Sequence, residues 1–342
     1  MIKVLIVEDS VTQREILARV VRSHCEMVVA GEAKSGEEAV EKVRELAPDV
    51  VLMDVQMDEM NGIDATRQIM RENPVPIVIM SSTLRKRDID LAVEALRVGA
   101  VAAIEKPKGA ALLHLAKIAP MLHQILHEAA GTKVRKTNAE PTIKPPVTSA
   151  EYQLPTGPVN VIGVCSSAGG PSVLVQIFSA LPANYKIPIL LVQHISAGFE
   201  EGFANWLTHQ TGQTARIAGE GQRLTPGIWL GPKDNHLVLK TPTRIGWLPR
   251  REDDIHCPAG NPLLVSIAEQ QGRNAVGVVL TGMGDDGAKG LLAMKQSGAQ
   301  TFIQDEATTL VWGMPKAAKK LGAFDYELTP PEIADALCRI GA

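Results

Sequence analysis

The stretch "VCSSAGGPS", residues 164–172, places Cys165, Ser166 and Ser167 between an apolar run and a Gly-Gly-Pro sequence. Glycines let backbone N–H groups approach a ligand closely, and proline suits the first turn of a helix. The serines should therefore lie near a helix N-terminus, where a developing oxyanion can be stabilised. This spacing predicts a nucleophile at a turn between a strand and a helix.

A serine hydroxyl is a weak nucleophile until a base removes its proton. His194 directly follows the apolar run "IPILLVQ", and the run "AVGVVLTG" leads into "MGDDGAKG", which contains Asp285 and Asp286. A serine, a histidine and an aspartate thus follow separate strands and can meet at one edge of a sheet. That is the arrangement a nucleophile, its base and the group orienting the base require.

Other interpretations compete with this one. A single histidine after a strand is more often structural than catalytic, and "TGMGDDG" could instead form a phosphate-binding loop. No Walker lysine pattern or complete GxGxxG follows a strand here, which disfavours nucleotide binding. Cys165 is an alternative nucleophile, but its place at a buried strand end favours a packed residue. Among the other histidines, His209 and His236 lack a strand-end context, and His256 precedes a helix expected near Pro258.

A second set of candidate residues lies in the first third of the chain. Glu8 and Asp9 end the first apolar run, and Asp54 ends the third. Neighbouring parallel strands share one crevice at their carboxyl ends, so these acids should meet there, where Mg²⁺ would offset their repulsion. The alternative is that they are simply solvated loop residues. Ser81 and Lys106 follow later strands, and together these groups could hold a phosphoryl group on the central carboxylate.

Short apolar runs that alternate with amphipathic segments predict an α/β architecture of two doubly wound parallel-sheet domains. We expect domains over 1–130 and 157–342, joined by a flexible linker over 131–156 that is rich in Pro, Thr, Lys and Ala. The first domain should contain strands at 3–7, 27–33, 49–54, 76–80 and 100–106. In the second domain we expect strands at 159–165, 188–193, 227–230, 236–240, 275–281 and 301–304.

The composition narrows the function classes. A formal net charge of −3 over 342 residues and no block rich in Lys and Arg argue against nucleic acid as a partner. The N-terminus reaches acidic residues too soon for a signal peptide, and no run of about 18 apolar residues occurs, so we expect a cytoplasmic protein without membrane insertion. The four cysteines form no CxxC pair and read as reduced thiols.

Residues 1–130 resemble a response-regulator receiver domain of the flavodoxin-like fold, on the stretches "VEDS", "LMDVQMDEMNGID", "MSS" and "EKP". The resemblance implies that Asp54 accepts a phosphoryl group from a histidine kinase. It also implies that Mg²⁺ is bound by Glu8, Asp9, Asp54 and the backbone carbonyl of Gln56, and that Ser81 and Lys106 sense the phosphate. Many receivers carry an aromatic residue where this chain has Ala103, which puts the usual aromatic switch in doubt.

Residues 157–342 resemble the Rossmann-like catalytic domain of the chemotaxis protein-glutamate methylesterase (CheB) family. The matching stretches are "IGVCSSAGG", "VQHISAGF", "LTGMGDDGAKGLLAMKQSGAQTFIQDEAT" and "VWGMPKAA". The resemblance implies that Ser167 is the nucleophile, His194 the general base and acid, and Asp286 its orienter, with the backbone N–H of Met283 as an oxyanion donor. It makes the substrate a glutamyl methyl ester on the cytoplasmic bundle of a chemoreceptor, with deamidation of receptor glutamines open, and it implies no cofactor for ester hydrolysis.

One segment departs from that family's pattern, because "HCPAGNPLLVSIAEQ" from His256 stands where an Arg-Pro-Ser-Val-Asp sequence is frequent. The substrate could differ accordingly, so hydrolysis of another ester remains an alternative. A non-catalytic, phosphorylation-dependent scaffold is a second alternative. For control, the resemblance to this family, together with the domain order, implies that the unphosphorylated receiver obstructs the esterase cleft and that phosphorylation of Asp54 favours an open arrangement.

Overall fold

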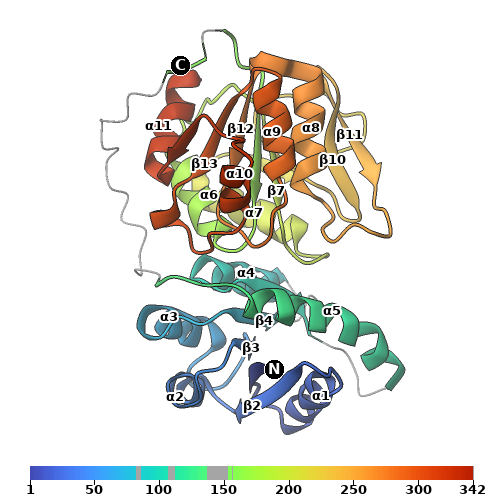
Figure 1. Cartoon of the computed structure of the whole chain (residues 1–342), viewed down its shortest axis with the longest axis vertical. Helices are drawn as coiled ribbons and strands as arrows, with labels where there is room; N and C mark the ends of the chain where they lie inside the picture. The colour runs from blue at the N-terminus through green and yellow to red at the C-terminus, as the bar shows by residue number, and fades with distance from the viewer. Residues whose placement is uncertain (82–85, 107–111, 137–152, 156, 342) are drawn as a thin grey trace. The chain divides into compact units, whose positions relative to one another are not determined.

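The computed structural model describes residues 1–81, 86–106, 112–136, 153–155 and 157–341, with backbone alone for 86–89 and 112–118. The chain divides into two compact units, residues 1–140 and 141–342 (Figure 1). Of the expected linker, residues 137–152 and 156 lie outside the described residues. No described helix is long and apolar enough to cross a membrane.

The first unit is a five-stranded parallel sheet with the order β2-β1-β3-β4-β5, the flavodoxin-like arrangement. Its strands confirm the predicted positions: Ile2–Val7 (β1), Met27–Ala33 (β2), Val50–Asp54 (β3), Ile77–Ser81 (β4) and Ala102–Glu105 (β5). The helices are Val11–Arg22 (α1), Gly36–Leu46 (α2), Gly62–Glu72 (α3), Lys86–Arg97 (α4) and Leu112–Ala130 (α5). Helix α3 contacts α2 and α4, and α1 contacts α5. Strands β3 and β4 are buried along their whole length because helices cover both faces, which explains their continuous apolar runs.

The second unit contains a seven-stranded parallel sheet with the order β14-β13-β12-β6-β7-β9-β8. Its strands are Val161–Ser166 (β6), Ile189–Gln193 (β7), Ala215–Ile217 (β8), Ile228–Leu230 (β9), Ala275–Val279 (β12), Gln300–Gln304 (β13) and Tyr326–Leu328 (β14). Helix Gly170–Ser179 (α6) contacts Glu200–Thr211 (α7) and Pro330–Ile340 (α11). Helix Ala288–Gln296 (α9) contacts Gly260–Gln271 (α8) and Met314–Lys320 (α10). Two helical layers thus cover the sheet, as expected for a doubly wound domain.

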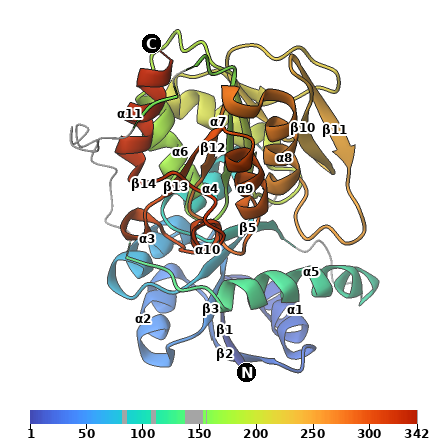
Figure 2. The same ribbon diagram turned by 45° about the horizontal axis from the view of Figure 1, so that its top comes forward.

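The expected strand at 236–240 forms, but outside the parallel sheet. Residues Asn235–Thr241 (β10) pair antiparallel with Arg244–Pro249 (β11), and Figures 1 and 2 show this arm beside α8. A tight turn rather than a helix follows β10, so the chain returns directly alongside it. Strands β8, β11 and β14 were not expected from the sequence. Two of them are only three residues long, and β11 carries a glycine and ends at Pro249.

Candidate active site

The two adjacent serines occupy different environments at the turn between β6 and α6. Ser166 is fully buried, and its hydroxyl donates to Gln193 Oε1 over 2.6 Å. Ser167 is 6 % exposed and stands just before Gly169, which has φ +78° and caps α6. Only Ser167 thus combines some solvent access with a position beside the helix N-terminus. The geometry favours Ser167 over Ser166 as the nucleophile.

The side chain of Gln193 joins this serine turn to the end of β7. Its Nε2 donates to Ser167 O over 2.9 Å and to His194 O over 3.0 Å. In addition, the backbone N–H of His194 donates to Ser166 O over 3.0 Å. These bonds hold the turn containing Ser167 against the residue predicted to be its base.

His194 forms a close pair with Asp286. The distance from His194 Nε2 to Asp286 Oδ2 is 2.8 Å, and both side chains are largely buried. Because the carboxylate accepts at Nε2, the proton lies on that nitrogen in the neutral ring. The other nitrogen, Nδ1, is buried and has no hydrogen-bond partner among the described residues. It is therefore the atom available to accept a proton.

Asp286 is held as an anion despite its burial. Burial alone would raise the pKa of this carboxyl, but the bond from His194 and the N–H groups of Gly260 and Asn261 lower it well below its usual range. Gly260 N donates to Oδ2, and Asn261 N donates to Oδ1 over 2.9 Å. These N–H groups begin α8, so the segment that departs from the family pattern is also the one that fixes Asp286. Asp285, by contrast, is exposed.

The loop containing Met283 lies against the nucleophile. A Cβ built on Gly282 would stand 2.7 Å from Ser167 Cβ, so only glycine permits this approach. The Gly282 carbonyl accepts from Met314 N over 2.9 Å, which helps to hold the loop. Met283 follows Gly282 in the chain, so its backbone N–H belongs to the loop that approaches Ser167. Its role as oxyanion donor stays a prediction.

Cys165 is unsuited to nucleophilic attack. It is fully buried in the core of the second unit, and that burial, with the charge of Asp286, raises the pKa of the thiol well above its ordinary value. The thiolate is the reactive form of cysteine, so this residue remains a packed thiol.

The structure brings His256 to the site, which the sequence interpretation missed. Its ring stacks on that of His194, with centroids 4.1 Å apart and planes inclined by 19°. Burial, the neighbouring His194 and Arg250 lower the pKa of His256 to about 4, although Asp286 opposes this. The only signal in the sequence was its position three residues before Ala259, the cap of α8.

In the first unit, Glu8, Asp9 and Asp54 offer carboxylate oxygens that all lie within 4.8 Å of one another. Burial and the charge of Asp54 raise the pKa of Glu8 to about 7, against the opposing effect of Lys106. A crowded set of oxygen donors of this kind fits Mg²⁺, which prefers oxygen ligands and would relieve the repulsion. The expected acidic site is therefore assembled at the carboxyl ends of β1 and β3.

Lys106 contacts Asp54 directly, and Ser81 ends the neighbouring strand β4. Lys106 Nζ lies 2.7 Å from Asp54 Oδ2 and 3.0 Å from Glu8 Oε2. Burial raises the pKa of Asp54, which the Lys106 ammonium and a backbone hydrogen bond from Gln56 partly offset. Ser81 is buried at the end of β4, and its carbonyl accepts from Lys106 N over 2.9 Å. Pro107, which completes the "EKP" stretch, lies outside the described residues.

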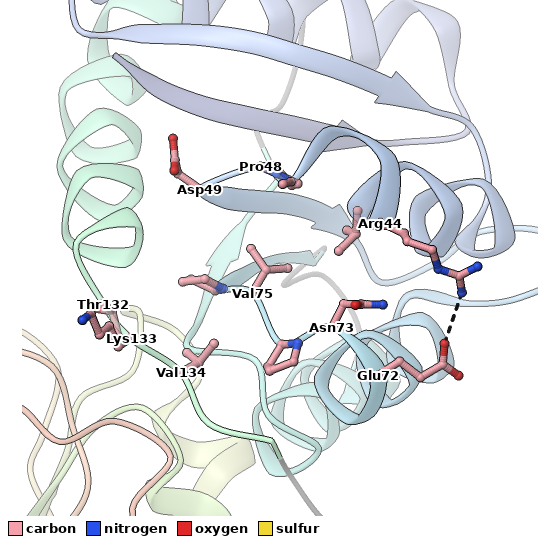
Figure 3. Close-up of a pocket in the computed structure, with 13 residues that line it drawn as sticks. Arg44, Pro48, Asp49, Glu72, Asn73, Val75, Thr132, Lys133 and Val134 are labelled. Atoms are coloured by element: carbon pink, nitrogen blue, oxygen red, sulfur yellow. Dashed lines mark hydrogen bonds and ion pairs between the residues drawn. The ribbon is translucent and has the colours of Figure 1, made fainter.

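A separate pocket of about 590 Å³ lies in the same unit (Figure 3). It is lined by residues that precede β3 and β4, among them Pro48, Asp49 and Pro76, and by Thr132–Val134. An ion pair of 3.5 Å joins Arg44 and Glu72 at its side. The pocket therefore lies at the amino ends of the strands, whereas Asp54 ends β3, and it takes no part in the acidic site.

Comparison with known proteins agrees with both halves of this description. The family model for the response regulator receiver domain matches residues 4–117, and the model for CheB methylesterase matches residues 162–337. The chain belongs to the CheB methylesterase family. The resemblance predicted from the sequence is thus confirmed for both domains.

Several relatives cover this chain almost completely. It is 38% identical over 344 residues to protein-glutamate methylesterase/protein-glutamine glutaminase 1 of Syntrophus aciditrophicus, covering 99% of this chain and 98% of that protein. It is 39% identical to protein-glutamate methylesterase/protein-glutamine glutaminase 3 of Anaeromyxobacter dehalogenans, with 98% of each covered. The crystal structure of the Thermotoga maritima CheB methylesterase catalytic domain matches with a TM-score of 0.50 and 33% identity, over 53% of this chain and 98% of that one.

Proposed function

We propose that this chain is a protein-glutamate methylesterase, controlled by phosphorylation of its receiver domain, that hydrolyses glutamyl methyl esters on chemoreceptors. The observation that carries the proposal is the pairing of His194 Nε2 with Asp286, which leaves a buried Nδ1 free to take a proton, on a residue whose backbone N–H bonds to Ser166 O next to Ser167. The two curated relatives bear the name of this activity together with that of a glutaminase.

The reaction proceeds in two steps. Ser167 Oγ attacks the ester carbonyl while His194 Nδ1 takes the hydroxyl proton, and Asp286 stabilises the imidazolium that forms. The carbonyl oxygen becomes an oxyanion, for which the Met283 N–H is the proposed donor. The bond from carbon to methoxy oxygen then breaks, and His194 returns the proton so that methanol leaves. Water attacks the acyl-enzyme by the same route, releasing the glutamate and regenerating Ser167.

Glutamine deamidation follows the same course, with ammonia leaving in place of methanol. The nucleophile, base and orienter keep their roles, because both substrates are acyl derivatives of the same side chain. We therefore assign the glutaminase reaction to the same three residues, with no cofactor for either hydrolysis.

In the receiver we assign Asp54 as the phosphoacceptor, with Lys106 and Ser81 holding the phosphoryl group. Glu8, Asp9 and Asp54, with the Gln56 carbonyl, would hold Mg²⁺, which supplies positive charge against the phosphoryl oxygens. Phosphorylation, with a histidine kinase as donor, then shifts the chain toward a population in which the receiver no longer obstructs the esterase site. The division into domains at 1–130 and 157–342 belongs to this proposal.

The test is methanol release from a methylated cytoplasmic receptor fragment by the full-length chain. We expect release to disappear in Ser167→Ala and to persist in Ser179→Ala, a matched serine exposed at the far end of α6. Mg²⁺ with a small phosphodonor should increase release, and Asp54→Asn should abolish only that increase. Release that persists in Ser167→Ala would refute the assigned nucleophile, and its absence from the wild type would refute the substrate.

A further inference from the structure

The imidazole ring of His194, the proposed base, makes few hydrogen bonds. The His194 ring has one hydrogen bond, from Nε2 to Asp286, because Nδ1 is without a partner among the described residues. A single bond at one edge leaves the ring free to tilt about that contact. Efficient proton transfer needs the plane and the free nitrogen fixed, since small misplacements cost large factors in rate.

The ring of His256 restrains that motion. It is stacked on His194, with ring centroids 4.1 Å apart and planes inclined by 19°. Tilting His194 toward His256 would drive its edge into the stacked ring.

The segment that carries His256 is itself clamped at two points by a second histidine. His236, on β10, is buried, and its Nε2 lies 2.7 Å from Asp254 Oδ2. Its Nδ1 accepts from Ala259 N over 3.1 Å, which assigns the proton to Nε2. The two anchor points lie on either side of His256 in sequence, so its backbone is tied down before and after the stacking residue.

Further bonds shape the same segment. Asp254 Oδ2 also accepts from Arg251 N over 2.6 Å, and Arg250 Nη2 donates to Asp254 O over 3.2 Å. The segment 250–259 is therefore organised around Asp254 rather than extended over the surface.

The stacking ring stays uncharged at neutral pH. Burial, His194 and Arg250 together lower the pKa of His256 to about 4. A neutral neighbour is compatible with a base that becomes an imidazolium during the reaction, whereas a second cation stacked on it would oppose that charge.

We propose that residues 250–259, seated on His236, form a positioning element for the general base, in which the His256 ring holds the plane of the His194 imidazole. His256 is thus a positioning residue, acting through His194. The inference rests on the proposed function only in naming His194 as the base.

The first test compares methanol release by full-length variants. His256→Ala should lower kcat by about ten- to a hundred-fold, since misplacing a reacting group costs factors of this size, with KM within about two-fold. His256→Phe keeps a flat ring in the same place and should restore most of kcat. His209→Ala, which removes an exposed histidine on α7, should leave both parameters unchanged. An unchanged kcat in His256→Ala would overturn the proposal, as would a loss confined to KM.

The second test does not depend on activity. In protein with ¹⁵N-labelled histidines, assigned with a His194→Gln variant, His194 should show a proton on Nε2 and none on Nδ1. Asp286 keeps that tautomer in every variant, but a ring that tilts weakens the bond from Nε2 to Asp286. We therefore expect His256→Ala to speed exchange of the Nε2 proton with water and His256→Phe to keep this exchange slow. If no esterase activity is found in the wild type but the exchange rates respond in this way, the proposed function fails while the positioning role stands. An exchange rate unaffected by His256→Ala would refute the positioning role.

A double-mutant cycle tests the clamp. Asp254→Asn and His256→Ala should each lower kcat, and the double variant should be little worse than His256→Ala alone, because both act through one segment. His236→Gln should behave like Asp254→Asn, with tryptophan fluorescence confirming folding in each variant. Losses in kcat that multiply would show that the anchor and the ring act independently and would overturn the clamp.

Discussion

His194 Nε2 and Asp286 Oδ2 lie 2.8 Å apart although 92 positions separate the two residues in the chain. The contact sets the tautomer of the imidazole and places its proton away from the nitrogen that must act as base. Asp286 is in turn fixed by two N–H groups at the start of α8, so the base is oriented by backbone as well as by side chain.

Asp286→Asn should therefore lower kcat by about 10⁴, the order seen when the aspartate of a serine protease triad is made neutral. An amide can present its NH₂ group to Nε2 and favour the wrong tautomer. The control is Asp285→Asn, which changes the exposed neighbour and should leave kcat unchanged. Equal losses in the two variants would contradict the assignment of Asp286.

Ser166→Ala should lower the free energy of unfolding and have little effect on kcat. It removes the buried 2.6 Å bond to Gln193 Oε1 and leaves that oxygen without this donor, which costs about 1–3 kcal/mol. All four tryptophans, at 206, 229, 247 and 312, lie in the second unit, so denaturation followed by tryptophan fluorescence reports on this unit alone. Ser167→Ala should instead abolish turnover with a smaller change in unfolding free energy. The reverse pattern would make Ser166 the nucleophile.

The lowered pKa of His256 should make the free energy of unfolding depend on pH. Its pKa is about 4 in the folded chain against an ordinary 6.5, so between these pH values the unfolded state binds more protons. The free energy of unfolding therefore includes the whole contribution of the neutral ring above pH 6.5. This contribution declines as the pH falls toward 4, by at most about 1.4 kcal/mol per pH unit. His256→Phe should remove this part of the slope, measured as unfolding free energy by tryptophan fluorescence at several pH values. A slope identical to that of the wild type would refute the depressed pKa.

Asp9→Asn should weaken Mg²⁺ binding to the receiver by about ten-fold or more, since it removes one of three clustered carboxylate ligands. Titration calorimetry on the full-length chain measures this directly. Asp58→Asn changes an exposed acid in the loop after β3 and serves as the control. Equal affinities in Asp9→Asn and the wild type would place the metal elsewhere.

The thiols should differ in reactivity according to burial. Cys25 is exposed and should react with a thiol reagent in the native protein, whereas Cys165 is buried and has a raised thiol pKa. Mass analysis of labelled peptides should find Cys165 modified only after denaturation. Native labelling of Cys165 would show that the end of β6 opens to solvent.

The sequence by itself determined the parallel α/β architecture and the strands that carry the predicted site residues. Continuous apolar runs such as 50–54 and 189–193 read as buried strands because helices cover both faces of a parallel sheet. Side chains just after such strands must gather at one edge of the sheet. For this reason the sequence places Asp54, His194 and the adjacent Asp285 and Asp286 near their partners.

The family resemblance implied Ser167 and Asp286, but only the tertiary structure shows the contacts that separate them from their neighbours. Ser166 differs from Ser167 through the bond to Gln193, and Asp286 differs from Asp285 through the N–H groups of α8. His256 reaches His194 because His236 holds its segment on both sides. The apolar pattern of a strand reflects burial and can be recognised from residues that are neighbours in the sequence. The path of a loop depends instead on hydrogen bonds between residues far apart in the sequence.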